Sequence, residues 1–131
     1  MNKNSMTALV STFARAYHSQ NSKPQIYDDP LAAKMLTTEE YSQISQNMTA
    51  GIKFFNPQFS GNEQEALLWI VNNQLAPSPL GRSAFCCQSL ANAVKIGAKQ
   101  YLIFGAGYDT FPYRQPTWSE QLQIFEIDHP D

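Results

Sequence analysis

The feature that most constrains the fold is a short apolar run that ends in two closely spaced glycines. Residues 101–104 (YLIF) are apolar without interruption, and Gly105-Ala106-Gly107 follows directly. A run of this length next to turn-forming residues is typical of a strand buried on both faces, as in a parallel sheet. A second candidate strand, residues 122–127, comes after a connection that contains two prolines. The sequence therefore predicts an α/β fold with two neighbouring parallel strands.

The first two-thirds of the chain has helical patterning, because its apolar residues recur at intervals of three and four. Predicted helices cover residues 5–20, 30–36, 39–55, 63–75 and 82–96. The short second helix should begin at Asp28-Asp29-Pro30, where an aspartate can accept from free amides. Thr37 and Glu40 have capping-box spacing before the third helix, which Gly51 weakens. Pro77-Ser78-Pro79 should stop the fourth helix.

This order of elements predicts a helical layer that leads into the first strands of a parallel sheet. Two strands cannot bury both faces of such a sheet, since three or more with covering elements are needed for independent stability. The chain ends at Asp131, so we expect it to be the truncated front part of a larger α/β domain. Apolar surface at the unfinished sheet edge predicts self-association.

Composition excludes several classes of protein. Nine Lys+Arg against eleven Asp+Glu give a net charge of −2, which argues against a nucleic-acid binder. No apolar stretch approaches the roughly 20 residues that cross a bilayer, and the N-terminus lacks a signal-peptide core. We therefore predict a cytoplasmic protein that does not bind membranes. Cys86 and Cys87 are adjacent and read as reduced, packed thiols, with no set of metal ligands around them.

Two acidic residues end the second strand, 21 and 23 residues after Gly105. A carboxylate about 20 residues beyond a glycine turn can accept the hydroxyl groups of a ribose. Glu126 and Asp128 share one side of the strand, so the pattern indicates a nucleoside-like ligand at the carboxyl ends of the strands. A tight turn beside a solvated strand end explains the pattern equally well. Thr110 replaces the third glycine of the dinucleotide fingerprint, which argues against a pyrophosphate cradle.

Residues 102–114 and 125–130 together resemble a family signature, G-A-G-x-D-T-x-x-x-R followed by E-x-D-x-P. The signature is similar to that of the leucine carboxyl methyltransferase-like family. These proteins are class I S-adenosylmethionine-dependent methyltransferases, a group that includes polyketide-associated O-methyltransferases. Residues 14–16 and 28–32 resemble the family's N-terminal helical cap. The resemblance implies a cap with the first crossover helices over residues 1–97 and the start of an S-adenosylmethionine-binding, Rossmann-like sheet over residues 98–131.

The resemblance also implies roles for individual residues. Gly105, followed by Gly107 in the same turn, would lie against the methionine part of S-adenosylmethionine. Asp128 would hold the ribose hydroxyls, with Glu126 as its neighbour. Arg82 is similar in position to the arginine that pairs with the cofactor's carboxylate, which suits a guanidinium group.

Four further residues carry open expectations. Arg15 resembles a basic residue that closes over the cofactor, and a solvated charge on a helix face is the alternative. Asp109 and Arg114 belong to the signature. We expect them to pair and fix the turn, and direct contact with the ligand is the alternative. His129 occupies a variable position of the motif and is expected to be a loop residue.

The function implied is methyl transfer to a carboxyl or hydroxyl group of a small or carrier-bound molecule. The cofactor carries the reactive group, so the protein must supply alignment and exclusion of water. The family's later strands are absent from this chain, so we do not expect it to catalyse unaided. Two alternatives stay open: a non-catalytic remnant or interaction module, and a nucleotide- or NAD-binding Rossmann protein.

Overall fold

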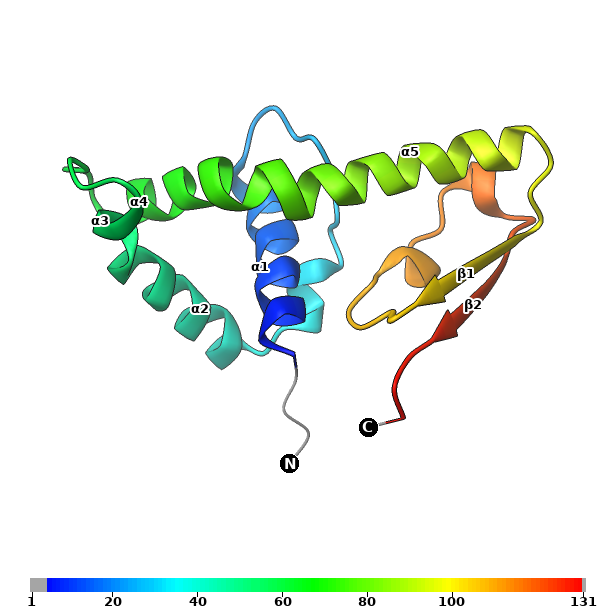
Figure 1. The fold of residues 1–131 in the computed structure, drawn as a ribbon, viewed down its shortest axis with the longest axis horizontal. Coiled ribbons are helices and arrows are strands. Elements are labelled where there is room, and N and C mark those ends of the chain that lie inside the picture. Colours follow the sequence, from blue (N-terminus) through cyan, green and yellow to red (C-terminus); the bar gives the residue numbers. More distant parts are fainter. Residues whose placement is uncertain (1–4, 131) are drawn as a thin grey trace.

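A long helical rod runs along one side of the computed structural model, which describes residues 5–130. The elements are α1 (Met6–Asn21), η1 (Ala32–Met35), α2 (Thr38–Ala50), α3 (Ile52–Phe55), α4 (Glu63–Ile70), η2 (Val71–Leu80), α5 (Gly81–Lys95), β1 (Gln100–Phe104), η3 (Phe111–Tyr113), η4 (Thr117–Ser119) and β2 (Gln123–Ile127). The rod consists of α4, η2 and α5. In Figure 1, α1 stands below its middle, α2 and α3 lie toward one end, and the strands lie below the other.

The predicted helices form, and their caps explain where several of them begin. Thr37 accepts from the Glu40 amide at 3.1 Å, and the Glu40 carboxylate accepts from the Thr37 amide at 2.9 Å. Asn62 and Glu65 form a second capping box at the start of α4. A capping box satisfies two amides that the first helical turn leaves without partners. Gly51 divides the predicted helix of residues 39–55 into α2 and α3.

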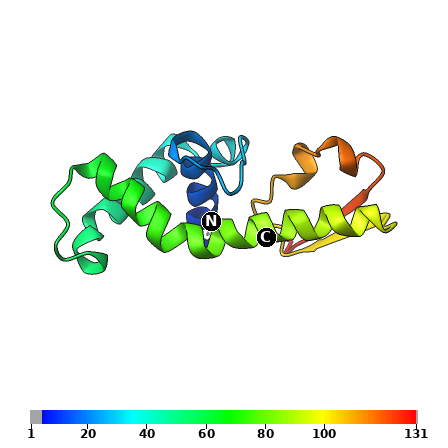
Figure 2. The ribbon, with the colours of Figure 1, turned by 90° about the horizontal axis from the view of Figure 1, so that it is seen from above.

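The prediction that Pro77-Ser78-Pro79 ends the fourth helix is wrong. The chain continues from α4 through η2, a π-helical segment that contains both prolines, into α5, and Figure 2 shows the rod spanning the molecule. The amide of Gly81 donates to the carbonyl of Ala76, five residues earlier. Packing favours continuation, because Val71 of η2 is fully buried against α1.

Three clusters of buried apolar side chains hold the molecule together. The largest joins α1 to α2, α4 and η2 and contains Leu9, Phe13, Tyr17, Leu36, Ile44, Leu67 and Val71. A second lies between α3 and α4 and contains Ile52, Ala66 and Ile70. The third joins α5 to the strand region through Leu90, Phe111 and Leu122. The helical layer thus has its own core, and α5 links it to the sheet.

The two strands are parallel neighbours, as predicted, with Gln100 opposite Gln123 and Phe104 opposite Ile127. One face packs against the third cluster through Tyr101 and Ile124. The opposite face carries four exposed apolar side chains, Leu102, Phe104, Phe125 and Ile127. The exposed face agrees with the expectation that two strands alone cannot bury both faces of such a sheet, since α5 covers only one of them. Self-association through the sheet stays a prediction.

The division of the chain at residues 97 and 98 stays a prediction, and Asp131 lies outside the described residues. Between residues 5 and 130, no helix combines the length and the hydropathy that a membrane span requires.

Candidate functional site

The glycine turn that follows β1 has a backbone conformation that favours glycine. Gly105 has a φ of +67° and Gly107 a φ of +51°, both in the left-handed region. A side chain in this region costs roughly 1–2 kcal/mol. A Cβ atom placed on Gly105 would meet no heavy atom within 4 Å, so conformation rather than crowding disfavours a side chain there. The turn leaves open space beside its first glycine.

The end of β2 lies directly against this turn. The Gly105 amide donates to the carbonyl of Ile127 at 2.7 Å. The Gly107 amide donates to Oδ2 of Asp128 at 2.6 Å, and the amide of His129 donates to Oδ1 at 2.7 Å. These two backbone donors lower the pKa of Asp128, so its carboxylate is ionised at neutral pH. The prediction that the glycine bend and Asp128 lie side by side is confirmed.

A pocket of about 540 Å³ opens between α1, the start of α5 and the glycine turn. Four of the six predicted site residues line it: Arg15, Arg82, Gly105 and Gly107. Asp128 adjoins it through its bond to the Gly107 amide. Glu126 is exposed opposite Ile103 in the strand register and does not line the pocket. The structure thus brings together five of the six predicted residues.

The two arginines of the pocket are in different states. Arg82 lies at the start of α5, is exposed, and makes no salt bridge with any of the described residues. Arg15 is 11% exposed and donates four hydrogen bonds, to Asp29 at 3.0 Å, to the Tyr108 carbonyl at 2.8 Å, and to Ser11 and Thr12. The alternative of a solvated charge on a helix face is therefore wrong for Arg15.

Asp29 is a central site residue that the sequence analysis treated only as a helix cap. Its carboxylate is 1% exposed. Oδ1 accepts from the Thr110 hydroxyl at 2.7 Å and from the Ala32 amide at 3.1 Å, and Oδ2 accepts from Arg15. The Ala32 bond confirms the predicted capping role. The pattern Asp28-Asp29-Pro30 predicted that bond but contained no signal for the distant partners.

The expected pair of Asp109 with Arg114 is wrong. Arg114 instead forms an ion pair with Asp29 at 3.5 Å and donates to the Thr110 hydroxyl at 2.8 Å. Asp109 accepts from the Phe111 amide at 2.9 Å. Asp109 therefore fixes the turn through the backbone alone. Asp29 competes better for Arg114 because burial strengthens the attraction between opposite charges.

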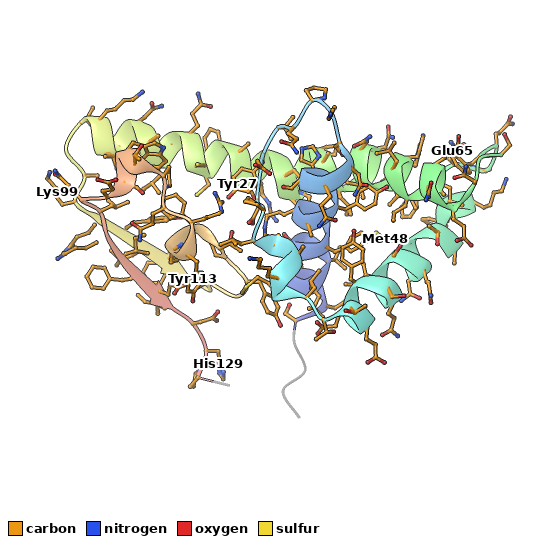
Figure 3. The ribbon with its side chains drawn as sticks, turned by 180° about the vertical axis from the view of Figure 1, so that it is seen from behind. Tyr27, Met48, Glu65, Lys99, Tyr113 and His129 are labelled. Carbon is orange, nitrogen blue, oxygen red and sulfur yellow. The ribbon has the colours of Figure 1, made fainter. Side chains whose placement is uncertain are left out.

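Tyr27 completes the wall between the helical layer and the turn. Arg114 lies 5.0 Å from the centre of the Tyr27 ring and also contacts its hydroxyl. Burial raises the pKa of Tyr27 to about 12, so this hydroxyl is protonated at neutral pH. Figure 3 shows Tyr27 on the segment between α1 and η1, whereas His129 lies near the end of the chain.

The two thiols on the α5 wall are free, as predicted, but the prediction that both are packed is wrong for Cys86, which is exposed, whereas Cys87 is half-buried. The Cys86 sulfur lies 3.5 Å from the Tyr101 hydroxyl, and burial raises the pKa of the Cys87 thiol. Among residues 5–130, no group of three or more histidine, cysteine, aspartate or glutamate side chains could hold a metal ion.

Comparison of the sequence with known proteins assigns the chain to a family. The sequence model of leucine carboxyl methyltransferase matches residues 8–131. The chain belongs to the leucine carboxyl methyltransferase family. The match covers α1, the Asp29 segment, the glycine turn and Asp128, so the resemblance carried by the two halves of the signature is confirmed.

Individual relatives agree with this assignment. A Bacillus subtilis (strain 168) protein named "Putative S-adenosyl-L-methionine-dependent methyltransferase YktD" is 45% identical over 98% of this chain. Similarly described proteins of Mycobacterium sp. (strain KMS) and Mycobacterium ulcerans (strain Agy99) are 31% and 29% identical over 79% and 95% of the chain. The chain spans 44% of the Bacillus protein's length, and the alignments cover 35% and 37% of the mycobacterial proteins.

Proposed function

We propose that this chain forms the S-adenosylmethionine-binding part of a methyltransferase that acts on a carboxyl or hydroxyl group of a small or carrier-bound molecule. The observation that carries the proposal is the 2.6 Å bond between the Gly107 amide and Asp128, beside the pocket. It joins a glycine turn to an ionised carboxylate at the carboxyl ends of two parallel strands. Ligands of open α/β sheets bind at this edge.

Asp128 has the acceptor capacity that a ribose requires. An ionised carboxylate offers about four lone-pair sites. Two are used by the amides of Gly107 and His129. The other two can accept from two neighbouring hydroxyl groups, and the lowered pKa of Asp128 keeps them available at neutral pH. Glu126 is exposed near Asp128 at the end of β2, and its proposed role is to add negative charge there.

The other proposed contacts follow from the open space at Gly105 and from the hydrogen-bond donors that each arginine has not already used. Gly105 leaves open space beside the turn, which fits the methionine part of the cofactor. Arg82 has no salt bridge among the described residues, so its guanidinium can pair with the cofactor's carboxylate. Arg15 has already used four hydrogen bonds. It therefore closes the pocket as a fixed wall that carries positive charge.

The cofactor, when bound, supplies a methyl group on a sulfonium centre. The chain's own task is to bind and orient it and to keep water away from it. A carboxylate acceptor is already ionised at pH 7 and needs no base, whereas a hydroxyl acceptor needs one.

The turn fits a dinucleotide less well. A pyrophosphate is held at the N-terminus of a helix that packs closely through a third glycine. Here Thr110 occupies that position, with its hydroxyl bonded to Asp29. The next element is η3, a 3-10 helix of only three residues, which is too short for such a cradle.

Calorimetric titration of the chain with S-adenosylhomocysteine and, separately, with NAD tests the proposal. We expect S-adenosylhomocysteine to bind and NAD not to. Asp128→Asn should weaken binding by about tenfold or more, the size of a lost hydrogen bond to a charged group. Glu120→Gln, at an exposed acid away from the pocket, is the matched control and should leave the Kd unchanged. Binding of NAD alone would remove the proposal.

A further inference from the structure

A buried carboxylate, that of Asp29, lies between the N-terminal helical layer and the segment that follows the glycine turn. We propose that Asp29 is a positioning residue of the cofactor pocket, which holds α1 against the glycine turn by binding Arg15, Arg114 and Thr110 together. The inference rests on the proposed function for what the pocket binds. The positioning itself concerns only residues of this chain, and it can be tested without a ligand.

Each oxygen of the Asp29 carboxylate has its own partners. Oδ2 accepts from Nε of Arg15 at 3.0 Å, which ties the carboxylate to α1. Oδ1 accepts from the Thr110 hydroxyl at 2.7 Å and lies 3.5 Å from Nε of Arg114, which ties it to the segment after the glycine turn. A single side chain therefore bridges two parts of the chain that are far apart in the sequence.

The network contacts the chain at two points just after the glycine turn. The Arg15 guanidinium donates at 2.8 Å to the carbonyl of Tyr108, the residue that follows Gly107. The Thr110 hydroxyl, two residues further, is held directly by Asp29. The turn can shift relative to α1 only if these bonds break. Because the Gly107 amide in turn holds Asp128, the position of the proposed ribose carboxylate depends on Asp29.

Burial makes this network stiff. Asp29 and Thr110 are each 1% exposed, and the side chains of Arg15 and Arg114 are 11% and 15% exposed. Water therefore has little access to replace a broken bond, and two guanidinium groups would be left facing each other without a carboxylate. Thr110, at the position of the third glycine of a dinucleotide fingerprint, belongs to this network, because its hydroxyl donates to Asp29 and accepts from Arg114.

The first experiment uses Asp29→Asn, which keeps the size of the side chain but removes its charge. Asp28→Asn, at the exposed neighbouring carboxylate, is the matched control. Nuclear magnetic resonance of the ligand-free chain follows the backbone amides of Gly105, Gly107 and Asp128. We expect these signals to move in Asp29→Asn and to stay in place in Asp28→Asn. Unmoved glycine signals in a folded Asp29→Asn chain would overturn the inference.

The second measurement separates positioning from stability. Ile44→Ala removes buried side-chain volume from the core between α1 and α2, away from the pocket. We expect the Kd for S-adenosylhomocysteine to rise about tenfold or more in Asp29→Asn and to change less than twofold in Ile44→Ala, at a temperature where both are folded. Equal effects in the two variants would show that Asp29 acts only through stability.

Thr110→Val covers the case in which Asp29→Asn does not fold. It removes the bond from the Thr110 hydroxyl to Asp29 and the bond from Arg114 to that hydroxyl, and it leaves both ion pairs of Asp29 in place. The same amide signals should move in the same direction by a smaller amount, and no movement would overturn the inference. If the wild-type chain does not bind S-adenosylhomocysteine, the proposed function fails, whereas the ligand-free amide signals still decide whether Asp29 positions the turn.

Discussion

Both sides of the pocket hold a carboxylate with several hydrogen-bond partners, but the two carboxylates are in opposite environments. On the α1 side, Asp29 is 1% exposed and bound to two arginines. On the strand side, Asp128 is exposed and accepts hydrogen bonds from two backbone amides. A buried carboxylate between cations is needed for the fold, whereas an exposed one contributes little to the fold and is open to a ligand. The difference separates the part of the site that shapes the pocket from the part that offers acceptors.

The largest expected effect is the loss of the buried carboxylate. Asp29→Ala leaves Arg15 and Arg114 buried without their common partner, and breaking a buried ion pair costs about 3–5 kcal/mol. This is a large share of the roughly 5–15 kcal/mol that stabilises a typical domain. Urea unfolding measures the loss, with Asp28→Ala as control. If Asp29→Ala loses less than about 1 kcal/mol of unfolding free energy, the network around Asp29 is not needed for the fold.

Acid should lower the free energy of unfolding through His18, which lies on α1. This side chain is 2% exposed, its Nε2 accepts from the Ile26 amide at 3.0 Å, and its Nδ1 has no partner in the described part of the chain. Burial lowers the pKa of His18, and the charge of Asp28 opposes that shift. The folded pKa is therefore below the unfolded value of about 6.5. Stability from the neutral imidazole is complete above that value and is lost as the pH falls through the folded pKa.

The pH dependence can be assigned to this group with His18→Gln. Unfolding free energies are measured between pH 8 and pH 5 for the wild type and the variant. The wild type should lose up to about 1.4 kcal/mol more per pH unit over the acidic part of this range, the limit for one proton. Parallel pH profiles for the two proteins would exclude His18 as the cause.

An intermediate effect is expected at the glycine turn between the two carboxylates. Gly107→Ala places a side chain at a φ of +51°, which should cost about 1–2 kcal/mol in the free energy of unfolding. Gly51→Ala is the control, because its φ is −82° and an added Cβ would make ordinary contacts of 3.5 Å. Thermal unfolding should show Gly51→Ala to be neutral or stabilising. Equal losses at both glycines would contradict the conformational argument.

The smallest expected effect on the fold is at the exposed carboxylate. Asp128→Asn removes an exposed charge that accepts from two backbone amides, so urea unfolding at pH 7 should detect only a small loss of stability, well below that of Asp29→Ala. The pKa of Asp128 is lowered in the folded chain, so its contact with Gly107 is complete above the unfolded pKa. That contact is lost only as the pH falls through the folded pKa. A marked loss of stability at pH 7 would remove the contrast with Asp29.

The sequence predicted the elements and the meeting of the turn with Asp128 because both depend on local patterns. Apolar periodicity predicted the helices and strands, and parallel pairing of neighbouring strands brings their carboxyl ends together. The prediction that the two prolines of η2 end the helix is wrong because tertiary packing of η2 on α1 outweighs the local cost of the prolines. Local sequence patterns were therefore sufficient to predict the part of the site formed by the glycine turn and Asp128.

The α1 side could not be predicted in the same way. Asp29 meets Arg15 at a separation of 14 residues and Thr110 at a separation of 81. A cap signal such as Asp29-Pro30 specifies a local amide partner, but it does not indicate which distant cations surround the carboxylate. The expected pairing of Asp109 with Arg114 failed for the same reason, since a buried competitor lay outside the local motif.

The most direct test of the glycine–carboxylate site follows the Gly107 amide signal while S-adenosylhomocysteine is added to the isotope-labelled chain. The signals of Gly105, Gly107 and Asp128 should move together, with their midpoint at the Kd found by calorimetry. In Asp128→Asn, with the chain still folded, the midpoint should move to a ligand concentration about tenfold higher or more. Binding that leaves these three signals in place, or a response to NAD in place of S-adenosylhomocysteine, would contradict the assignment.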